Sequence, residues 1–90
     1  MTVSLVQVRA QNGEYVAQIG SGSLATTAYC KVSAGAAARI AFARRVGLYP
    51  HTRANIAAIK VARVAVSAAS GTELFLCELV DAGTPERSAA

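Results

Sequence analysis

The sequence predicts an α+β domain in which one main helix packs on one face of an antiparallel sheet of four or five strands. Two dipeptides typical of tight turns, Asn12-Gly13 and Ser70-Gly71, each separate two runs that have the composition of strands. Between these two hairpins lies an alanine-rich segment, residues 34–46, with the composition of a helix. The predicted order of elements is therefore β-β-β-α-β-β, built as one layer of sheet and one of helix.

The first hairpin spans residues 3–19, and Asn12-Gly13 tolerates the positive φ angles of a type I′ turn. This turn sets Gln11 opposite Glu14. The pairs Ala10–Tyr15, Val8–Ala17 and Val6–Ile19 then share one face, while the other face carries Gln7, Arg9 and Gln18. We expect the first face to be core and the second to be largely solvated.

A third strand and the main helix follow the first hairpin. Residues 24–31 favour a pleated surface through Thr26, Thr27 and Tyr29. Residues 20–25 also match the GxGxxG/A pattern of dinucleotide-binding loops, but a strand follows where that motif requires a helix, so we interpret them as a turn. Ser33 is the expected N-cap of the helix, and Gly47 the expected residue just beyond its end.

Residues 53–70 combine the alanines of a helix with the valines of a strand. In a continuous helix, Lys60 and Arg63 would lie on the same side as the isoleucines and interrupt the apolar stripe. The pattern therefore predicts a short helix over residues 52–58 followed by a strand. An all-helical second half remains the alternative.

The second hairpin has a predicted register centred on Ser70-Gly71. It pairs Val66 with Phe75, Val64 with Cys77 and Ala62 with Leu79, and these residues form the predicted core face. The same register sets Arg63 opposite Glu78 and Lys60 opposite Asp81, two favourable cross-strand charge pairs.

The opposite face of this second hairpin is too apolar for a solvated surface, because its apolar residues are interrupted by few polar ones. We therefore expect a non-enzymatic binding or assembly module that forms a homodimer or larger homo-oligomer through this face. The predicted interface residues are Val61, Arg63, Ala65, Leu74, Leu76, Glu78 and Val80.

The charge distribution supports an alternative function. The chain has a net charge of +4, and residues 15–72 contain seven Lys and Arg residues but no acidic residue. Such a field attracts nucleic acid or an acidic protein. The residues predicted to make these contacts are Lys31, Arg39, Arg44, Arg45 and Arg53. The order of elements also resembles the architecture of small antitoxin domains of the HicB class, a resemblance that implies a nucleic-acid-binding regulator and identifies no site residues.

Catalytic and metal-binding patterns are not evident in the sequence. His51 is the only imidazole, and Cys30 and Cys77 stand 47 positions apart without a CxxC or zinc spacing. We expect two reduced thiols, no cofactor and no metal in a cytoplasmic protein, with a disulfide between the cysteines as the alternative. No apolar run is long enough for a membrane span. Residues 1–82 are expected to form a single domain, and residues 83–90 a flexible tail.

Overall fold

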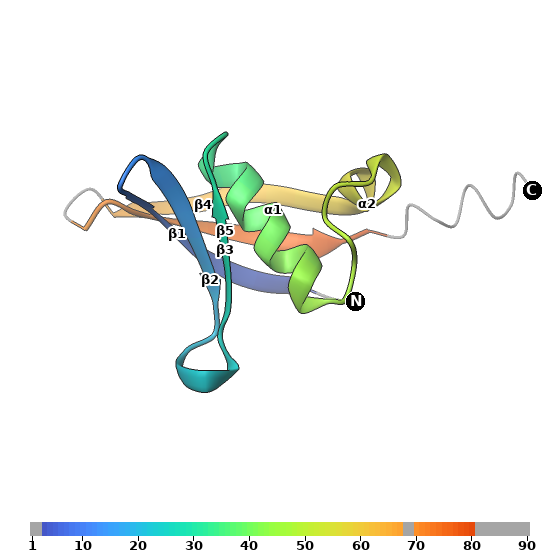
Figure 1. Ribbon diagram of the computed structural model, residues 1–90, viewed down its shortest axis with the longest axis horizontal. Helices are drawn as coiled ribbons and strands as arrows, with labels where there is room; N and C mark the ends of the chain where they lie inside the picture. The colour runs from blue at the N-terminus through green and yellow to red at the C-terminus, as the bar shows by residue number, and fades with distance from the viewer. Residues whose placement is uncertain (1–2, 68–69, 81–90) are drawn as a thin grey trace, which may run out of the picture.

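The computed structural model describes residues 3–67 and 70–80 (Figure 1). The elements in chain order are β1 (Val3–Gln11), β2 (Glu14–Ile19), a short 3₁₀ turn η1 (Gly22–Leu24), β3 (Thr26–Cys30), α1 (Ala34–Arg45), α2 (Arg53–Ala58), β4 (Ile59–Ser67) and β5 (Thr72–Leu79). The strands form one five-stranded antiparallel sheet in the order β3-β2-β1-β5-β4. α1 crosses one face of this sheet and contacts all five strands. The predicted α+β class and its order of elements are confirmed.

The first hairpin has the predicted register. Gln11 lies opposite Glu14, Ala10 opposite Tyr15 and Val8 opposite Ala17. Asn12 and Gly13 both have positive φ, 53° and 83°, as a type I′ turn requires. This register directs Val6, Val8, Ala17 and Ile19 into the core.

α1 begins and ends where the sequence predicts. The Ser33 hydroxyl accepts a hydrogen bond from the Ala36 amide at 3.0 Å, so Ser33 is the N-cap. Gly47, with φ of 82°, follows the C-cap residue Val46. The short helix α2 is also confirmed, and the Thr52 hydroxyl caps it by accepting from the Asn55 amide at 3.3 Å.

Small residues line both sides of the contact between α1 and the sheet. Ala37, Ala38 and Ala41 of the helix are fully buried, as are Ala17 and Ala28 on the adjacent strands β2 and β3. Because these side chains are small, the helix backbone lies close to the sheet, and the Cys77 thiol of β5 approaches the Ala38 carbonyl oxygen to 3.7 Å. Phe42 is the largest of the fully buried side chains.

The predicted register of the second hairpin is wrong. Arg63 lies opposite Phe75 rather than Glu78, Lys60 lies opposite Glu78, and Val61 rather than Val64 lies opposite Cys77. Arg63 instead forms an ion pair with Glu73 at 3.2 Å. The predicted partner of Lys60, Asp81, lies outside the described residues, as does the predicted tail over residues 83–90.

A β-bulge between Arg63 and Ala65 explains part of this error, because an extra residue on one strand changes the pairing on either side of it. Val61 consequently packs against the core, whereas Val64 and Val66, both predicted to be core, are 52% and 56% exposed.

Candidate interaction surface

The sheet face opposite α1 is the principal candidate for a functional surface. Within residues 3–67 and 70–80, no helix packs on it. We call it the helix-free face. Its residues alternate with the core residues of each strand, because successive side chains of a strand point to opposite faces.

An apolar cluster spans β1, β5 and β4 on the helix-free face. Leu5 lies opposite Leu76, which lies opposite Ala62, and in the next row Leu74 lies opposite Ala65. Leu5 is 55% exposed, and Leu74 and Leu76 are partly exposed. These five residues, called the leucine patch below, form a continuous apolar area. On a solvated face of an antiparallel sheet, polar side chains would be expected at these positions.

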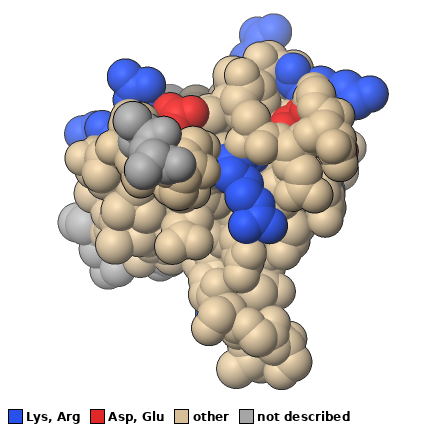
Figure 2. Space-filling model, turned by 90° about the vertical axis from the view of Figure 1, so that its left-hand side faces the viewer, with Lys and Arg blue, Asp and Glu red and all other residues tan. Residues whose placement is uncertain are grey.

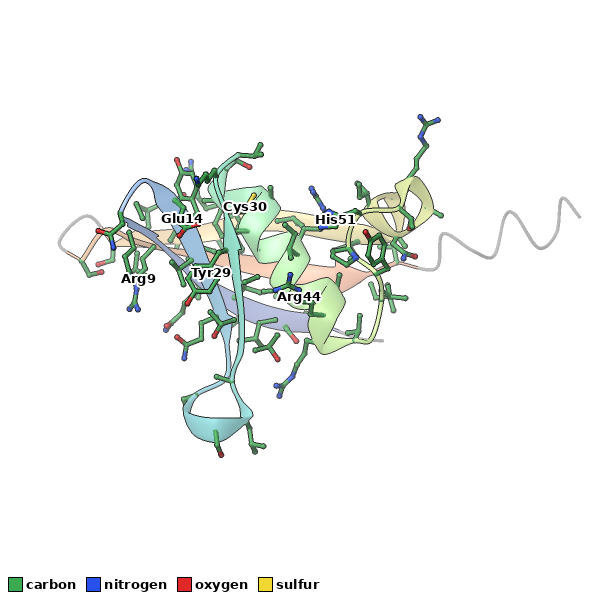
Figure 3. The ribbon with its side chains drawn as sticks, in the orientation of Figure 1. Arg9, Glu14, Tyr29, Cys30, Arg44 and His51 are labelled. Atoms are coloured by element: carbon green, nitrogen blue, oxygen red, sulfur yellow. The ribbon has the colours of Figure 1, made fainter. Side chains whose placement is uncertain are left out.

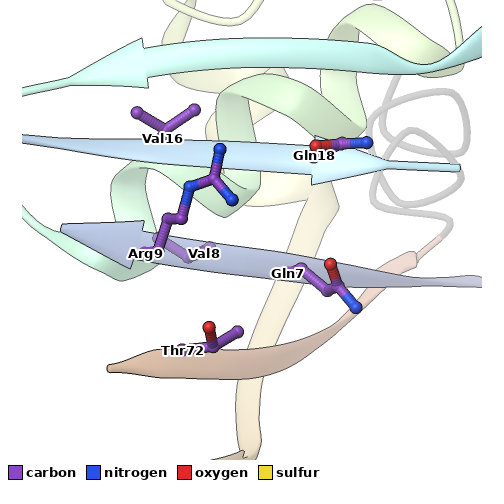
Figure 4. Close-up of a pocket in the computed structure, with 6 residues that line it drawn as sticks. All are labelled: Gln7, Val8, Arg9, Val16, Gln18 and Thr72. Carbon is purple, nitrogen blue, oxygen red and sulfur yellow. The ribbon is translucent and has the colours of Figure 1, made fainter. Parts of the chain in front are cut away.

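The helix-free face is hollowed beside the leucine patch. One hollow of about 470 Å³ is lined by Leu5, Gln7, Gln18, Gly20, Ser21 and Leu74. A second of about 360 Å³ is lined by Gln7, Ala65, Val66, Ser67, Ser70, Thr72 and Leu74. Figure 4 shows a third, smaller hollow in which the Arg9 side chain reaches from β1 across β2 near Val16 and Gln18. Gln7 borders all three, so they form one uneven surface rather than separate sites.

Charged residues flank the leucine patch at its two ends. Arg9 lies opposite Thr72 at one end, and Glu78 lies between Val3 and Lys60 at the other. Among the described residues, the one ion pair is Arg63–Glu73, so neither Arg9 nor Glu78 has a charged partner within ion-pair distance.

Four of the seven residues predicted for the interface lie on the helix-free face, namely Ala65, Leu74, Leu76 and Glu78. Val61 and Arg63 instead lie on the side of α1, a correction that follows from the register. Val80 lies just beyond β5, and its amide donates to the Ala58 carbonyl oxygen at 2.8 Å. The predicted interface did not include Leu5. Leu5, Gln7 and Arg9 are alternate residues of β1, so they lie on the same face of the sheet, opposite to that of Val6.

The five predicted nucleic-acid contacts do not gather in one place. Lys31 precedes α1, whereas Arg44 and Arg45 lie in its last turn, and Arg53 begins α2. Arg45 donates to the Leu24 carbonyl oxygen at 2.7 Å and Arg44 to the Thr27 carbonyl oxygen at 3.4 Å. Arg39 is partly buried in the middle of α1. Figure 2 shows separate groups of Lys and Arg side chains on one side of the molecule, without a continuous basic surface.

Both outer strands of the sheet carry features that hinder pairing with another strand. β3 is only five residues long, and Arg44 and Arg45 donate to carbonyl oxygens in and beside it. β4 is longer but contains the bulge and two cations, Lys60 and Arg63, with no acidic residue. Bulges and charges on edge strands are common means of preventing edge-to-edge association. The helix-free face is therefore a better candidate interface than either edge.

The two cysteines are free thiols, as predicted. Cys30 lies opposite Tyr15, which lies opposite Ala10 of β1, whereas Cys77 lies opposite Ser4, six residues before Ala10 on β1. With three strand spacings of about 4.8 Å also between them, they are too far apart for a disulfide. Burial raises the pKa of the Cys77 thiol from 9.0 to about 11.

Cys30 is expected to react with a thiol reagent in the folded protein, and Cys77 to react only after unfolding. Because the pKa of Cys77 is raised in the folded state, its thiol should favour folding below pH 9, and this contribution should fall as the pH rises from 9 to about 11. Mass spectrometry after labelling, with and without denaturant, measures the first effect. Comparison with Cys77→Ala in that pH range measures the second. Equal labelling of both thiols in the native protein would contradict the prediction.

His51 lies in the loop before α2, where its ring meets that of Tyr49 edge-on at 5.4 Å. Figure 3 shows Cys30 and His51 well separated, so they form no thiol–imidazole pair. In the described part of the chain there is no group of three or more His, Cys, Asp or Glu side chains arranged to hold a metal ion. None of the described helices is long and apolar enough to cross a membrane.

The GxGxxG/A segment is a turn, as interpreted from the sequence. Gly20 and Gly22 have φ angles of 79° and 66°, and β3 rather than a helix follows η1. Comparison of the chain with protein-family models, with curated proteins and with solved structures gave no match.

Proposed function

We propose that the protein is a non-enzymatic interaction module that associates with a second copy of itself through the helix-free face. The observation that carries this proposal is the leucine patch, which joins β1, β5 and β4 on a face that the described helices leave uncovered. Burial of such a patch against another chain removes apolar surface from water, which is the main favourable contribution to association.

The size of the face is compatible with a stable dimer. Five strands spaced by about 4.8 Å, and about 25 Å long, give a projected area of about 600 Å². Because side chains project from the plane of the sheet, the accessible area of the face is larger than this projected area. It is therefore near the roughly 800 Å² that each partner buries in a standard interface. A second copy is the occupant we favour because the face carries both a cation and an acid, Arg9 and Glu78, at opposite ends of the apolar patch.

Leu76→Arg is expected to convert a dimer into folded monomers, because it places a charge in the centre of the buried patch. Sedimentation velocity should show loss of the dimer, with an unchanged circular dichroism spectrum. Leu24→Arg is the matched control, since Leu24 is 79% exposed on the turn between β2 and β3. The proposal is rejected if the unmodified chain is a monomer at tens of micromolar, or if both variants weaken the dimer equally.

The predicted alternative, a nucleic-acid-binding regulator, is tested on the same sample. Nucleic-acid binding through the basic residues would give absorbance at 260 nm that falls steeply with salt. Self-association through an apolar patch should persist in high salt. The dispersion of the five predicted basic residues, and the use of Arg44 and Arg45 in hydrogen bonds to β3 and the turn before it, favours the first proposal.

A further inference from the structure

We infer that the second copy docks about a two-fold axis that crosses the strands in the middle of the leucine patch, so that Arg9 of each copy pairs with Glu78 of the other. The inference rests on the proposed self-association and specifies which surfaces of the two copies meet. It follows from the positions of two opposite charges relative to the apolar patch.

The positions of Arg9 and Glu78 are symmetric about the leucine patch. Glu78 lies in the row of Val3, and Arg9 lies six residues further along β1. At about 3.4 Å per residue the two rows are about 20 Å apart. The point midway between them falls between the Leu5–Leu76 row and the Gln7–Leu74 row, which is the centre of the patch. A two-fold axis across the strands at this point exchanges the row of Arg9 with the row of Glu78.

Two other two-fold axes fit the face less well. An axis along β5 would place Glu78 opposite Glu78 of the second copy, and like charges in a desolvated interface are unfavourable. An axis between β4 and β5 would pair Lys60 with Glu78, but it would overlap only these two strands and leave Leu5 uncovered. The axis across the strands extends over all five strands and places no like charges directly opposite each other.

The usual geometry of stacked sheets supports the charge pairing. Aligned sheets pack with their strands rotated by about 30°. At about 10 Å from the axis, this rotation moves a residue sideways by about 5 Å, or one strand spacing. Arg9 and Glu78 lie on adjacent strands, β1 and β5, so this is the sideways displacement that brings each over the other.

The apolar residues are also complementary in this arrangement. Leu76 of one copy faces Leu74 of the other, and Ala62 faces Ala65. The exposed Leu5 faces Gln7 of the second copy, beside the hollow of about 470 Å³ that Gln7, Gln18 and Leu74 help to line. With the same sideways displacement, Lys60, which is in the row of Glu78, faces Thr72 of the second copy, one strand away from Arg9.

Charge reversal tests the inference, because the two reversed chains should complement each other. Arg9→Glu and Glu78→Arg each create two repulsive pairs in their own homodimer, and each should weaken it by about tenfold or more. In an equimolar mixture, the heterodimer regains both attractive pairs, so association should recover to within about threefold of the unmodified protein. Sedimentation equilibrium, with one variant carrying a chromophore, measures each species.

The control mixture combines Lys60→Glu with Glu78→Arg, which would complement only about the axis between β4 and β5. We expect no recovery from it. Recovery in this mixture, or none in the first mixture, overturns the inferred axis while a dimeric unmodified protein still supports the proposed function. An unmodified chain that is monomeric rejects both. Circular dichroism of each variant confirms that the fold is retained.

Discussion

Phe42→Ala is expected to destabilise the protein by about 3–5 kcal/mol, the usual cost of removing a fully buried aromatic side chain. Phe42 has no exposed surface, and it lies on α1 within the single cluster of core residues. The neighbouring positions on α1 are mostly alanines, which are too short to fill the space that the ring leaves. A small domain has a total stability of only about 5–15 kcal/mol, so the variant should be close to unfolding at 37 °C.

Urea unfolding followed by circular dichroism measures this loss. Leu24→Ala is the control, because Leu24 is 79% exposed and its truncation should change the free energy of unfolding by less than about 0.5 kcal/mol. A loss below about 1 kcal/mol for Phe42→Ala would show that the ring is not packed as described.

Ala38→Leu is expected to destabilise the protein by about 1–3 kcal/mol, and it should do so by adding volume rather than removing it. Ala38 is fully buried, and its carbonyl oxygen lies 3.7 Å from the Cys77 sulfur. A leucine there would push α1 away from β5, which would loosen the contacts of the alanines along the same helix face.

The same substitution at an exposed helical position provides the control. Ala57 lies on the exposed surface of α2, and Ala57→Leu should be nearly neutral because alanine and leucine have similar helix propensities. If both leucine variants unfold at the same urea concentration, close packing between α1 and the sheet does not contribute as we describe. A larger loss at position 38 supports the view that the alanines determine how close the helix lies.

Elements specified by neighbouring residues were predictable from the sequence alone. Asn12-Gly13 determined the register of β1 and β2, because a two-residue turn leaves one pairing for the strands that it joins. Ser33 and Gly47 determined the ends of α1. The charges at positions 60 and 63 indicated where α2 gives way to β4, since they are incompatible with an apolar helical stripe. In each case the signal and the structure lie within a few residues of each other.

The interaction surface was predictable only in part. Leu74, Leu76 and Glu78 were identified because β5 alternates regularly, and its core residues Phe75 and Cys77 leave the others on the opposite face. Ala65 of β4 was predicted from a register that is wrong, and it lies on the helix-free face because of the bulge after Arg63. Leu5 and Arg9 could not be joined to them, because nothing in the sequence shows that β5 lies beside β1. Their pairing connects segments that are more than 60 residues apart in the chain.

The tertiary structure alone decided the register of β4 and β5 and the place of β5 in the sheet. Ser70-Gly71 predicts a two-residue turn, but β4 ends at Ser67 and β5 begins at Thr72, and these two residues pair. The bulge after Arg63 then changes the pairing again. Two cross-strand charge pairs, each worth about 0.2–1 kcal/mol, favoured the predicted register. The observed register instead buries Ile59 and packs Val61 against the core beneath α1. This outweighs the charge pairs, because burying one large apolar side chain contributes about 1.5–3 kcal/mol.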